Sequence, residues 1–282
     1  MPASVIDGKG IADAIRANLK EEVSRMRAIG ITPKLHVILV GQKPESLNYV
    51  RIKERSSKEI GMGFELEQLP ESTKESELID RIKKLNTDPS VNGMLVQLPL
   101  PLHIKRMNVL GAISPEKDVD GLTPLNMGKL VAGDETLSAA TSKGIIRLFE
   151  ASGTVLAGRN VVIINRSLNV GKPLVSLLLN RNATVTICHS FTTNVEQFTR
   201  IADIVICAVG RPGFLTGAMV RKGSVVIDVG LTYVHGKGVG DVDASVKDVA
   251  SRITTVPHGV GPMTVAMLLE NTVLVTKKQH GI

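Results

Sequence analysis

Tyr49 and Lys53 are the residues of this chain whose types and spacing first indicate chemistry. The chain has only 2 tyrosines, and this one stands four residues before a lysine in a segment that reads as the start of a helix. Positions four apart on a helix share a face, so a phenol ring and an ammonium group would project together. A tyrosine–lysine pair at this spacing is more often ordinary surface packing, so its meaning depends on its surroundings.

The surroundings favour a ligand site. A strand-like run at residues 35–40 ends at Gly41, and Pro44 suits the first turn of the following helix. In open α/β sheets, ligands bind at the carboxyl ends of the strands. Gln97 lies near the end of another strand-like run, where its amide would either hydrogen-bond a lysine or substrate or simply cap the strand.

Two aspartates precede a glycine in a loop further along. Asp118 and Asp120 lie before Gly121, without the further ligands that a calcium loop requires. A carboxylate on such a turn either holds the amino and ring N–H groups of a heterocycle or serves the turn itself. No set of His, Cys, Asp or Glu has convincing metal-ligand spacing, so we expect no metal site.

Alternating segments are expected to position these residues. Strand-like runs alternate with helical ones, which predicts an α/β fold with largely parallel sheets in two lobes. The first lobe is expected at residues 1–140 and the second at 141–261, with a final helix at 262–282 that packs back on the first lobe. The expected strands are residues 35–40, 64–69, 93–98, 161–165, 183–188, 203–208 and 224–229.

The turn after the strand at 161–165 has the layout of a dinucleotide site. It lacks the usual glycine pattern because Asn165 stands where the first glycine would be, and asparagine tolerates left-handed backbone angles. A polyphosphate is expected at the N-terminus of the helix after Gly171, drawn by free amides. Arg166 and Ser167 suit a 2′-phosphate, and no acidic residue follows the next strand to hold a ribose hydroxyl, so NADP is favoured over NAD. The alternative is a bare structural turn.

Composition narrows the class of protein. The 282 residues are 43% hydrophobic and 22% charged, which is normal for a globular protein, and only 2% are aromatic. Cys188 and Cys207 lie in apolar runs, as buried thiols of a reducing compartment do. No secretory signal or membrane span is expected, so we expect a cytoplasmic protein. The net charge of +7 is scattered among acidic residues, which suits anionic small molecules as well as nucleic acid.

With these motifs in order, nearly the whole chain resembles the bifunctional methylenetetrahydrofolate dehydrogenase/methenyltetrahydrofolate cyclohydrolase family. The motifs include Val-Gln-Leu-Pro-Leu-Pro at 96–101 and Pro-Glu-Lys-Asp-Val-Asp-Gly at 115–121. The others are residues 40–53, 166–173, 183–190, 226–230, 240–243 and 259–264.

The resemblance implies NADP-dependent oxidation of 5,10-methylenetetrahydrofolate, then hydrolysis to 10-formyltetrahydrofolate. It implies a catalytic, folate-binding first lobe, a Rossmann-like NADP lobe and a homodimer, with neither nucleic acid nor membrane as partner. The implied catalytic and folate-binding residues are Tyr49, Lys53, Gln97 and Asp120, with Pro257 and Gly261 also on the folate. The implied cofactor residues are Thr141, Asn165, Arg166, Ser167, Gly171, Ser190, Leu231 and Thr232.

Four segments depart from the usual family sequence. They are residues 139–142, Asn165, Leu231 with Thr232, and His258, and all lie in or near the expected cofactor lobe. The expected folate residues are intact. Two alternatives stay open: a dehydrogenase without cyclohydrolase activity, and a nucleotide-sensing or nucleic-acid-binding protein on a Rossmann-like scaffold. A binding module would not need the set of Tyr49, Lys53, Gln97 and Asp120.

Overall fold

The structure is a computed structural model that describes residues 2–282, and the chain divides into two compact units. Residues 14–140 and 265–282 form one unit around a sheet of three strands, which we call the three-stranded unit. The residues up to Asp13 and residues 141–264 form the other, the six-stranded unit. Both sheets are entirely parallel, as the alternation of strands and helices predicts.

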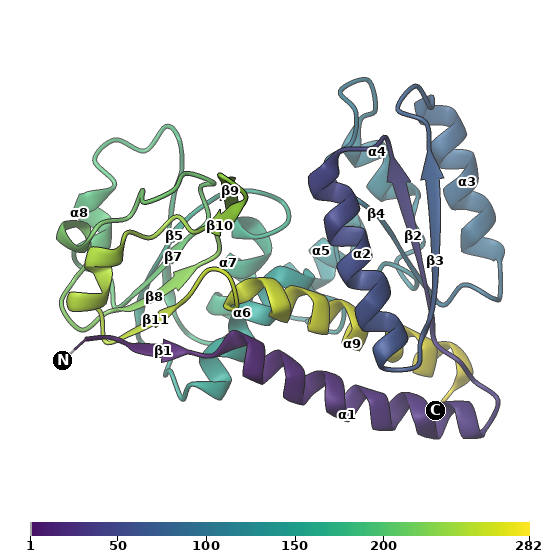
Figure 1. The fold of residues 1–282 in the computed structure, drawn as a ribbon, viewed down its shortest axis with the longest axis horizontal. Helices are drawn as coiled ribbons and strands as arrows, with labels where there is room; N and C mark the ends of the chain where they lie inside the picture. Colours follow the sequence, from purple (N-terminus) through teal and green to yellow (C-terminus); the bar gives the residue numbers. More distant parts are fainter. Residues whose placement is uncertain (1) are drawn as a thin grey trace. The chain divides into compact units, whose positions relative to one another are not determined.

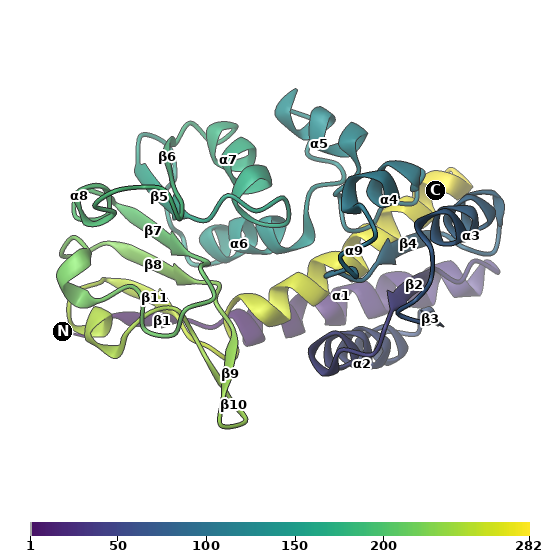
Figure 2. The same cartoon turned by 90° about the horizontal axis from the view of Figure 1, so that it is seen from above.

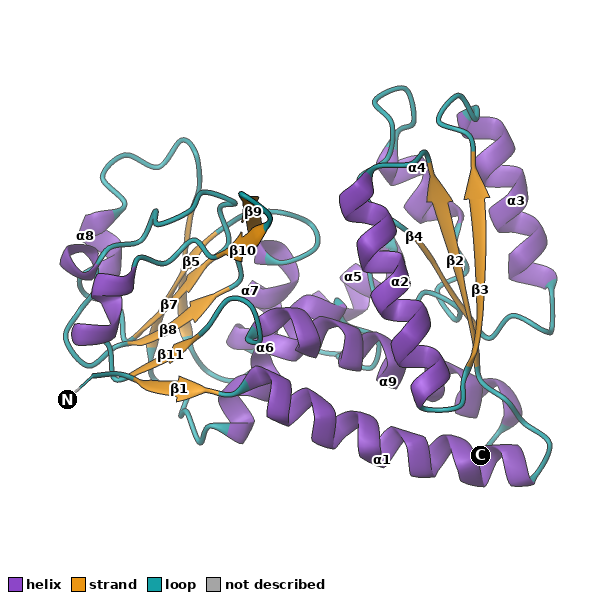
Figure 3. Cartoon of the chain, in the orientation of Figure 1, coloured by secondary structure: helices purple, strands orange, loops and turns teal. Residues whose placement is uncertain are grey.

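The sheet of the three-stranded unit has the order β3-β2-β4. The central strand β2 is buried along almost its whole length, which explains why it is aliphatic from Leu35 to Val40 apart from His36. Right-handed crossovers put α2 and α3 on opposite faces of the sheet, and Figures 1 and 3 show the sheet between these helices. The strands are β2 (Lys34–Val40), β3 (Gly63–Leu69) and β4 (Gly93–Val96). The helices are α1 (Gly8–Ala28), α2 (Pro44–Glu59), α3 (Glu75–Thr87), α4 (Arg106–Ala112) and α5 (Pro124–Val131).

The C-terminal helix α9 (Val260–His280) belongs to the three-stranded unit from Val265 onward. The Asn271 side chain is fully buried and donates to the backbone carbonyls of Val119 at 2.9 Å and Ser138 at 3.3 Å. Near the end of the helix, the Lys277 ammonium lies 2.7 Å from a carboxylate oxygen of Glu22 on α1. The prediction that the last helix returns to the first lobe is therefore confirmed.

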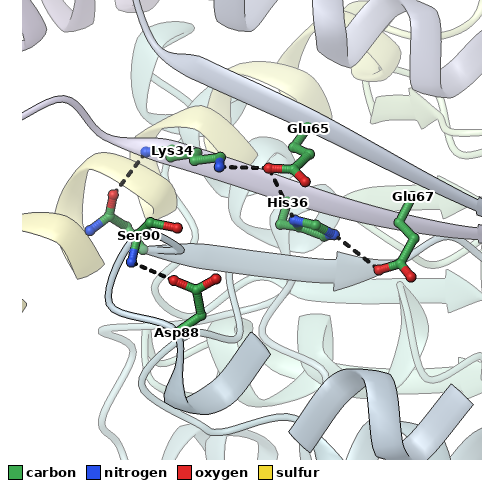
Figure 4. Close-up of polar contacts among 7 residues, drawn as sticks. Lys34, His36, Glu65, Glu67, Asp88 and Ser90 are labelled. Atoms are coloured by element: carbon green, nitrogen blue, oxygen red, sulfur yellow. Dashed lines mark hydrogen bonds and ion pairs between the residues drawn. The ribbon is translucent and has the colours of Figure 1, made fainter. Parts of the chain in front are cut away.

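A polar network lies at the edge strand of the same sheet. His36 of β2 is 3% exposed, and its Nδ1 and Nε2 lie 3.8 Å from a Glu65 oxygen and 3.4 Å from a Glu67 oxygen on β3 (Figure 4). Neither ring nitrogen has a hydrogen-bond partner among the described residues. Lys34 pairs with Glu65, and Arg81 with Glu67. The imidazole ring is therefore interior, and carboxylates rather than hydrogen-bond partners lie beside its nitrogens.

The six-stranded unit has the order β1-β11-β8-β7-β5-β6, which Figure 2 shows strand by strand. The chain leaves β5 in one direction for β6 and returns past it to β7, so the strand order reverses beside β5. In doubly wound sheets the carboxyl ends at such a reversal form the ligand-binding crevice. The strands are β1 (Ser4–Ile6), β5 (Asn160–Ile164), β6 (Thr184–Cys188), β7 (Ile204–Cys207), β8 (Val225–Asp228) and β11 (Arg252–Thr254).

The remaining elements of this unit are short. The helices are α6 (Ala140–Ala151), α7 (Gly171–Leu179) and α8 (Glu196–Thr199), and a two-stranded antiparallel hairpin comprises β9 (Thr232–Val234) and β10 (Lys237–Val239). The core between helices and sheet is aliphatic, and Cys188 and Cys207 lie in it as free, buried thiols. Across residues 2–282, no helix has the length and apolarity to cross a membrane, and no cluster of three potential metal ligands occurs.

Strand β1 differs from the expected division of the chain. Residues 4–6 pair with β11, so the N-terminal segment completes the sheet of the six-stranded unit although the sequence places residues 1–140 in the first lobe. Strands β1 and β11 have only 3 residues each, which is too short for a hydrophobic period to be visible in the sequence.

Candidate active site

Lys53 lies on α2, directly after the central strand of the three-stranded unit. Gly41 has φ +87° and turns the chain out of β2, and Pro44 stands in the first turn of the helix. The Lys53 ammonium is partly buried and donates a 2.8 Å hydrogen bond to Oε1 of Gln97. The predicted pairing of a lysine with an amide at the end of a neighbouring strand is therefore present in the structure.

Gln97 is fixed by hydrogen bonds from both its backbone and its side chain. Its backbone N–H donates to the Ile38 carbonyl of β2 at 2.8 Å, and its side-chain Nε2 donates to the Leu98 carbonyl at 2.7 Å. Because Nε2 is engaged, Oε1 is directed at Lys53. The residue is 9% exposed, so the amide is a rigid part of the interior rather than a mobile surface group.

Burial sets the electrostatics of this group. It lowers the pKa of the Lys53 ammonium, an effect that the charge of Asp120 opposes. Burial also raises the pKa of the Asp120 carboxyl, while Lys53 acts in the opposite direction and Asp118 adds to the rise. The two groups therefore form a desolvated amine–carboxyl pair, which is typical of residues that exchange protons in catalysis.

The two aspartates have different tasks. Asp118 is 1% exposed, and its carboxylate accepts hydrogen bonds from the N–H groups of Gly121, Leu122 and Thr123 and from the Asn126 amide, at 2.8 to 3.2 Å. It thus fixes the loop from within. Asp120 makes none of these bonds and stands two residues further along the same loop. The sequence offered this turn role as one of two alternatives for the aspartates, and only the path of the loop shows that Asp118 is the carboxylate that takes it.

Gly121 allows that path. Its φ is +68°, and a Cβ atom there would come 2.5 Å from the Ser138 carbonyl carbon. Tyr49 completes the set from α2: it is 39% exposed and lies one turn before Lys53. In the structure, Lys53 is hydrogen-bonded to Gln97 and interacts electrostatically with Asp120. Tyr49 lies on the same helix as the lysine.

The six-stranded unit holds the expected nucleotide loop after β5. The Asn165 Oδ1 accepts from the N–H groups of Ser167 at 2.7 Å and Gly171 at 3.0 Å, and its Nδ2 donates to the Ala208 carbonyl after β7 at 2.6 Å. Asn165 is not among the residues with positive φ, so the expected reason for an asparagine here is wrong. Its amide, not a left-handed backbone, forms the turn.

The free amides expected at the start of α7 are absent in this part of the described chain. The Gly171 N–H is taken by Asn165, the Lys172 N–H donates to the Ser167 carbonyl at 3.0 Å, and Pro173 has none. The approach of the helix to the loop is close, since a Cβ on Gly171 would lie 2.2 Å from the Asn165 carbonyl oxygen. The backbone N–H groups in the first turn of α7 therefore already have acceptors in the preceding loop.

Arg166 extends from this loop to the turn after β6. Its guanidinium carbon lies 5.3 Å from the ring centroid of Phe191, which the sequence analysis did not single out. Ser190 is an exposed neighbour in the same turn. An exposed guanidinium with hydroxyls beside it suits an anionic nucleotide, and Asn169 of the same loop has a buried Oδ1 without a hydrogen-bond partner. These groups fit a dinucleotide held mainly by side chains.

The other expected ligand residues lie elsewhere in the six-stranded unit. Thr141 is at the start of α6, where its hydroxyl accepts from Thr264 at 3.2 Å. Leu231 and Thr232 are partly buried where β9 begins, and Pro257 and Gly261 flank the start of α9. His258, between them, has φ +86°, a backbone conformation that favours glycine.

Comparisons with known proteins agree with both parts of this description. The family "Tetrahydrofolate dehydrogenase/cyclohydrolase, catalytic domain" matches residues 6–120, and "Tetrahydrofolate dehydrogenase/cyclohydrolase, NAD(P)-binding domain" matches residues 139–280. The bifunctional protein FolD of Exiguobacterium sibiricum is 53% identical over 276 residues, which cover 98% of this chain and 100% of that protein.

Solved structures are similar over the same length. The bifunctional methylenetetrahydrofolate dehydrogenase/cyclohydrolase FolD of Campylobacter jejuni is 43% identical with a TM-score of 0.96, covering 98% of this chain and 99% of that one. The Trypanosoma brucei dehydrogenase–cyclohydrolase, complexed with NADP and an inhibitor, is 36% identical with a TM-score of 0.96 and covers 100% of both chains. With both halves matched and relatives aligned end to end, the chain belongs to the tetrahydrofolate dehydrogenase/cyclohydrolase family.

Proposed function

We propose that this protein oxidises 5,10-methylenetetrahydrofolate to the methenyl form with NADP and then hydrolyses the product to 10-formyltetrahydrofolate. The observation that carries the proposal is the Lys53–Gln97 hydrogen bond of 2.8 Å together with the electrostatic interaction of Lys53 with the partly buried Asp120. Family membership supports both activities, and the relative from Trypanosoma brucei carries NADP.

The oxidation demands little acid–base chemistry from the protein. Bound NADP supplies the hydride acceptor, and the nitrogen lone pairs next to the methylene carbon stabilise the cation that develops there. The protein's part is to hold the folate in a reactive orientation. Asp120 would anchor the amino and ring N–H groups of the pterin, and Tyr49 would pack against the folate rings, with Pro257 and Gly261 as further folate contacts.

The hydrolysis is where Lys53 is needed. A water oxygen bonds to the methenyl carbon and loses a proton to the neutral amine of Lys53; the bond from that carbon to N5 then breaks while N5 gains a proton from the resulting ammonium. The added hydroxyl loses its proton as the formyl carbonyl forms, so the step consumes one water and releases one proton. Burial, which lowers the pKa of Lys53, keeps enough of the amine neutral to accept the first proton.

The nucleotide would bind the six-stranded unit at the carboxyl ends of β5 and β6. Arg166 and Ser190 would contact the 2′-phosphate, and Asn165, Ser167 and Gly171 would shape the loop beneath it. Thr141, Leu231 and Thr232 would make the remaining cofactor contacts. We assign cofactor binding to residues 141–261 and folate chemistry to residues 1–140 with the final helix, apart from strand β1, which extends the cofactor sheet.

Two separate rate measurements test the proposal. Turnover of 5,10-methylenetetrahydrofolate is followed by absorbance with NADP and with NAD, and hydrolysis of supplied methenyltetrahydrofolate is followed without nucleotide. We expect both activities, with NADP preferred. Oxidation without accelerated hydrolysis would indicate a dehydrogenase alone, and salt-dependent nucleic-acid binding without either activity would overturn the enzymatic assignment.

We further propose that the protein acts as a homodimer in the cytoplasm. Strand β3 is an edge strand that pairs only with β2 among the described residues, and Leu66 on it is 37% exposed, so a second copy has an edge to pair with. The free thiols of Cys188 and Cys207 suit a reducing compartment. Light scattering of the unaltered protein and of Leu66→Lys tests the dimer: a monomeric unaltered protein would contradict it.

A further inference from the structure

The first turn of helix α7 has little backbone left to offer an anion. Asn165 Oδ1 already accepts from the Ser167 and Gly171 N–H groups, and the Lys172 N–H is bonded to the Ser167 carbonyl. The asparagine amide therefore stands where a phosphate oxygen would otherwise be drawn to the start of α7. A positive charge for an anionic nucleotide has to come from a side chain at this loop, and Arg166 is the charged residue in it.

Arg166 is placed by an aromatic ring. Phe191 is 79% exposed, yet its ring lies 5.3 Å from the Arg166 guanidinium carbon, within the range of a cation–π contact. An exposed phenylalanine gains little from burial here, so the contact with the guanidinium gives this ring a role that burial does not.

The turn that carries Phe191 is itself fixed. The Phe191 N–H donates to Nδ1 of His189 at 3.2 Å, the His189 N–H donates to the Thr192 hydroxyl at 2.9 Å, and the His189 and Phe191 rings meet edge to face at 6.3 Å. The ring is therefore presented by a closed turn at the carboxyl end of β6, the position from which doubly wound folds contact the adenosine ribose.

We propose that Phe191 is a specificity-determining positioning residue: it holds the Arg166 guanidinium in place for the 2′-phosphate of an adenine nucleotide. This rests on the proposed NADP dependence and adds a residue to it. A flexible arginine loses conformational freedom when it binds a phosphate, and a guanidinium already resting on a ring has lost part of it beforehand. The benefit is confined to nucleotides that carry the 2′-phosphate, because only they engage the guanidinium.

The test is calorimetric binding to the full chain, without catalysis. Adenosine 2′,5′-bisphosphate and NADP are titrated against NAD for the unaltered protein, Phe191→Ala, Phe191→Trp and Arg166→Ala. We expect Phe191→Ala to weaken binding of the two 2′-phosphorylated ligands about fivefold, the size of the ordering cost of one flexible side chain, with NAD affinity unchanged. Phe191→Trp keeps a ring face and should retain the affinity.

A control variant tests whether the effect is specific to Phe191, and a double variant tests whether Phe191 acts through Arg166. Ile201 is 65% exposed and precedes β7 at the amino end of the same sheet, so Ile201→Ala should change no affinity. In the Arg166→Ala background, Phe191→Ala should have no further effect, because the ring acts through the arginine.

Each outcome separates the two proposals. If the unaltered protein binds NADP but Phe191→Ala binds the bisphosphate equally tightly, or weakens NAD to the same extent, the role of Phe191 is refuted while NADP dependence stands. Additive losses in the double variant also refute it. If the unaltered protein binds neither 2′-phosphorylated ligand, the NADP proposal fails and the role of Phe191 fails with it.

Discussion

The Nζ atom of Lys53 donates to Oε1 of Gln97 across 2.8 Å, joining helix α2 to the end of β4. Gln97 is neutral, so it orients the amine without supplying a negative charge that would hold its proton. Burial disfavours the charged form of the lysine at the same time. The pair is thus arranged to let Lys53 gain and lose a proton, which the following predictions test.

Replacement of Lys53 by methionine should separate the two activities. Lys53→Met removes the proton acceptor but keeps the length of the side chain, so hydrolysis of methenyltetrahydrofolate should fall by at least about a hundredfold, within the usual contribution of acid–base catalysis. Oxidation of the methylene form should survive better. Lys58 lies on the same helix and is bonded to Glu54, so Lys58→Met serves as a control with both rates unchanged. Equal collapse of both rates in a folded Lys53→Met protein would refute this division.

The hydrolysis rate should depend on pH through the Lys53 amine. Its pKa is lowered by burial, so the catalysed rate should rise with pH and level off at an inflection below the ordinary lysine value of about 10.4. Gln97→Glu puts a carboxylate beside the amine, raises its pKa and should move the inflection to higher pH. Gln97→Met removes the hydrogen bond without adding charge and should lower the rate without such an upward shift. Rates are measured after subtraction of uncatalysed hydrolysis.

Substitution of Asp118 should reduce stability, whereas substitution of Asp120 should reduce folate binding. Asp118→Ala leaves four donors without their acceptor and should lower the free energy of unfolding by about 3 kcal/mol or more. Asp120→Ala removes a buried carboxyl that makes none of those bonds, so it should leave stability nearly unchanged while folate binding weakens. Urea unfolding and folate titration of both variants distinguish these roles; a stable Asp118→Ala protein would contradict the first.

Asp228 should contribute a fall in the stability of the protein as the pH rises from about 4 to 6. Burial outweighs three backbone donors and raises the pKa of this carboxyl to about 6. Between the unfolded value of about 3.9 and the folded value, the folded state binds more protons, so its advantage over the unfolded state shrinks with increasing pH.

Asp228→Asn should remove that slope. The variant should also be less stable overall, because one amide NH₂ would face a backbone N–H that needs an acceptor. The exposed Asp248→Asn serves as control and should leave the slope unchanged. Urea unfolding across this pH range measures all three proteins, and an unaltered slope in Asp228→Asn would show that another group is responsible.

Much of the fold could be predicted from the sequence because seven of its strands carry apolar or alternating runs with clear ends. Strands β1 and β11 could not, since three residues show no period and their partners are distant in the sequence. Gln97 was predicted as a partner of a lysine or substrate because it stands near the end of a strand. Lys53 was singled out because its helix directly follows another strand. The contrast between Asp118 and Asp120 was not predicted, because it depends on which carboxylate the loop folds around.

Asn165 illustrates another limit of sequence reasoning. Its residue type suggested a left-handed backbone, whereas the structure uses the side chain to bind two amides and the Ala208 carbonyl. Both roles are common for asparagine in turns, and the local sequence does not distinguish them. Phe191 was overlooked because its role depends on contact with Arg166, which follows a different strand.

The pairing of β1 with β11 has a consequence for biosynthesis. Ser4 is made among the first residues, but its partner Arg252 leaves the ribosome about 250 residues later, which is roughly 12 to 50 s at usual synthesis rates. During that time the nascent amino terminus has no strand to join. The cofactor-binding half can therefore reach its native pairing only near the end of translation, and a segment limited to residues 141–261 would lack an outer strand.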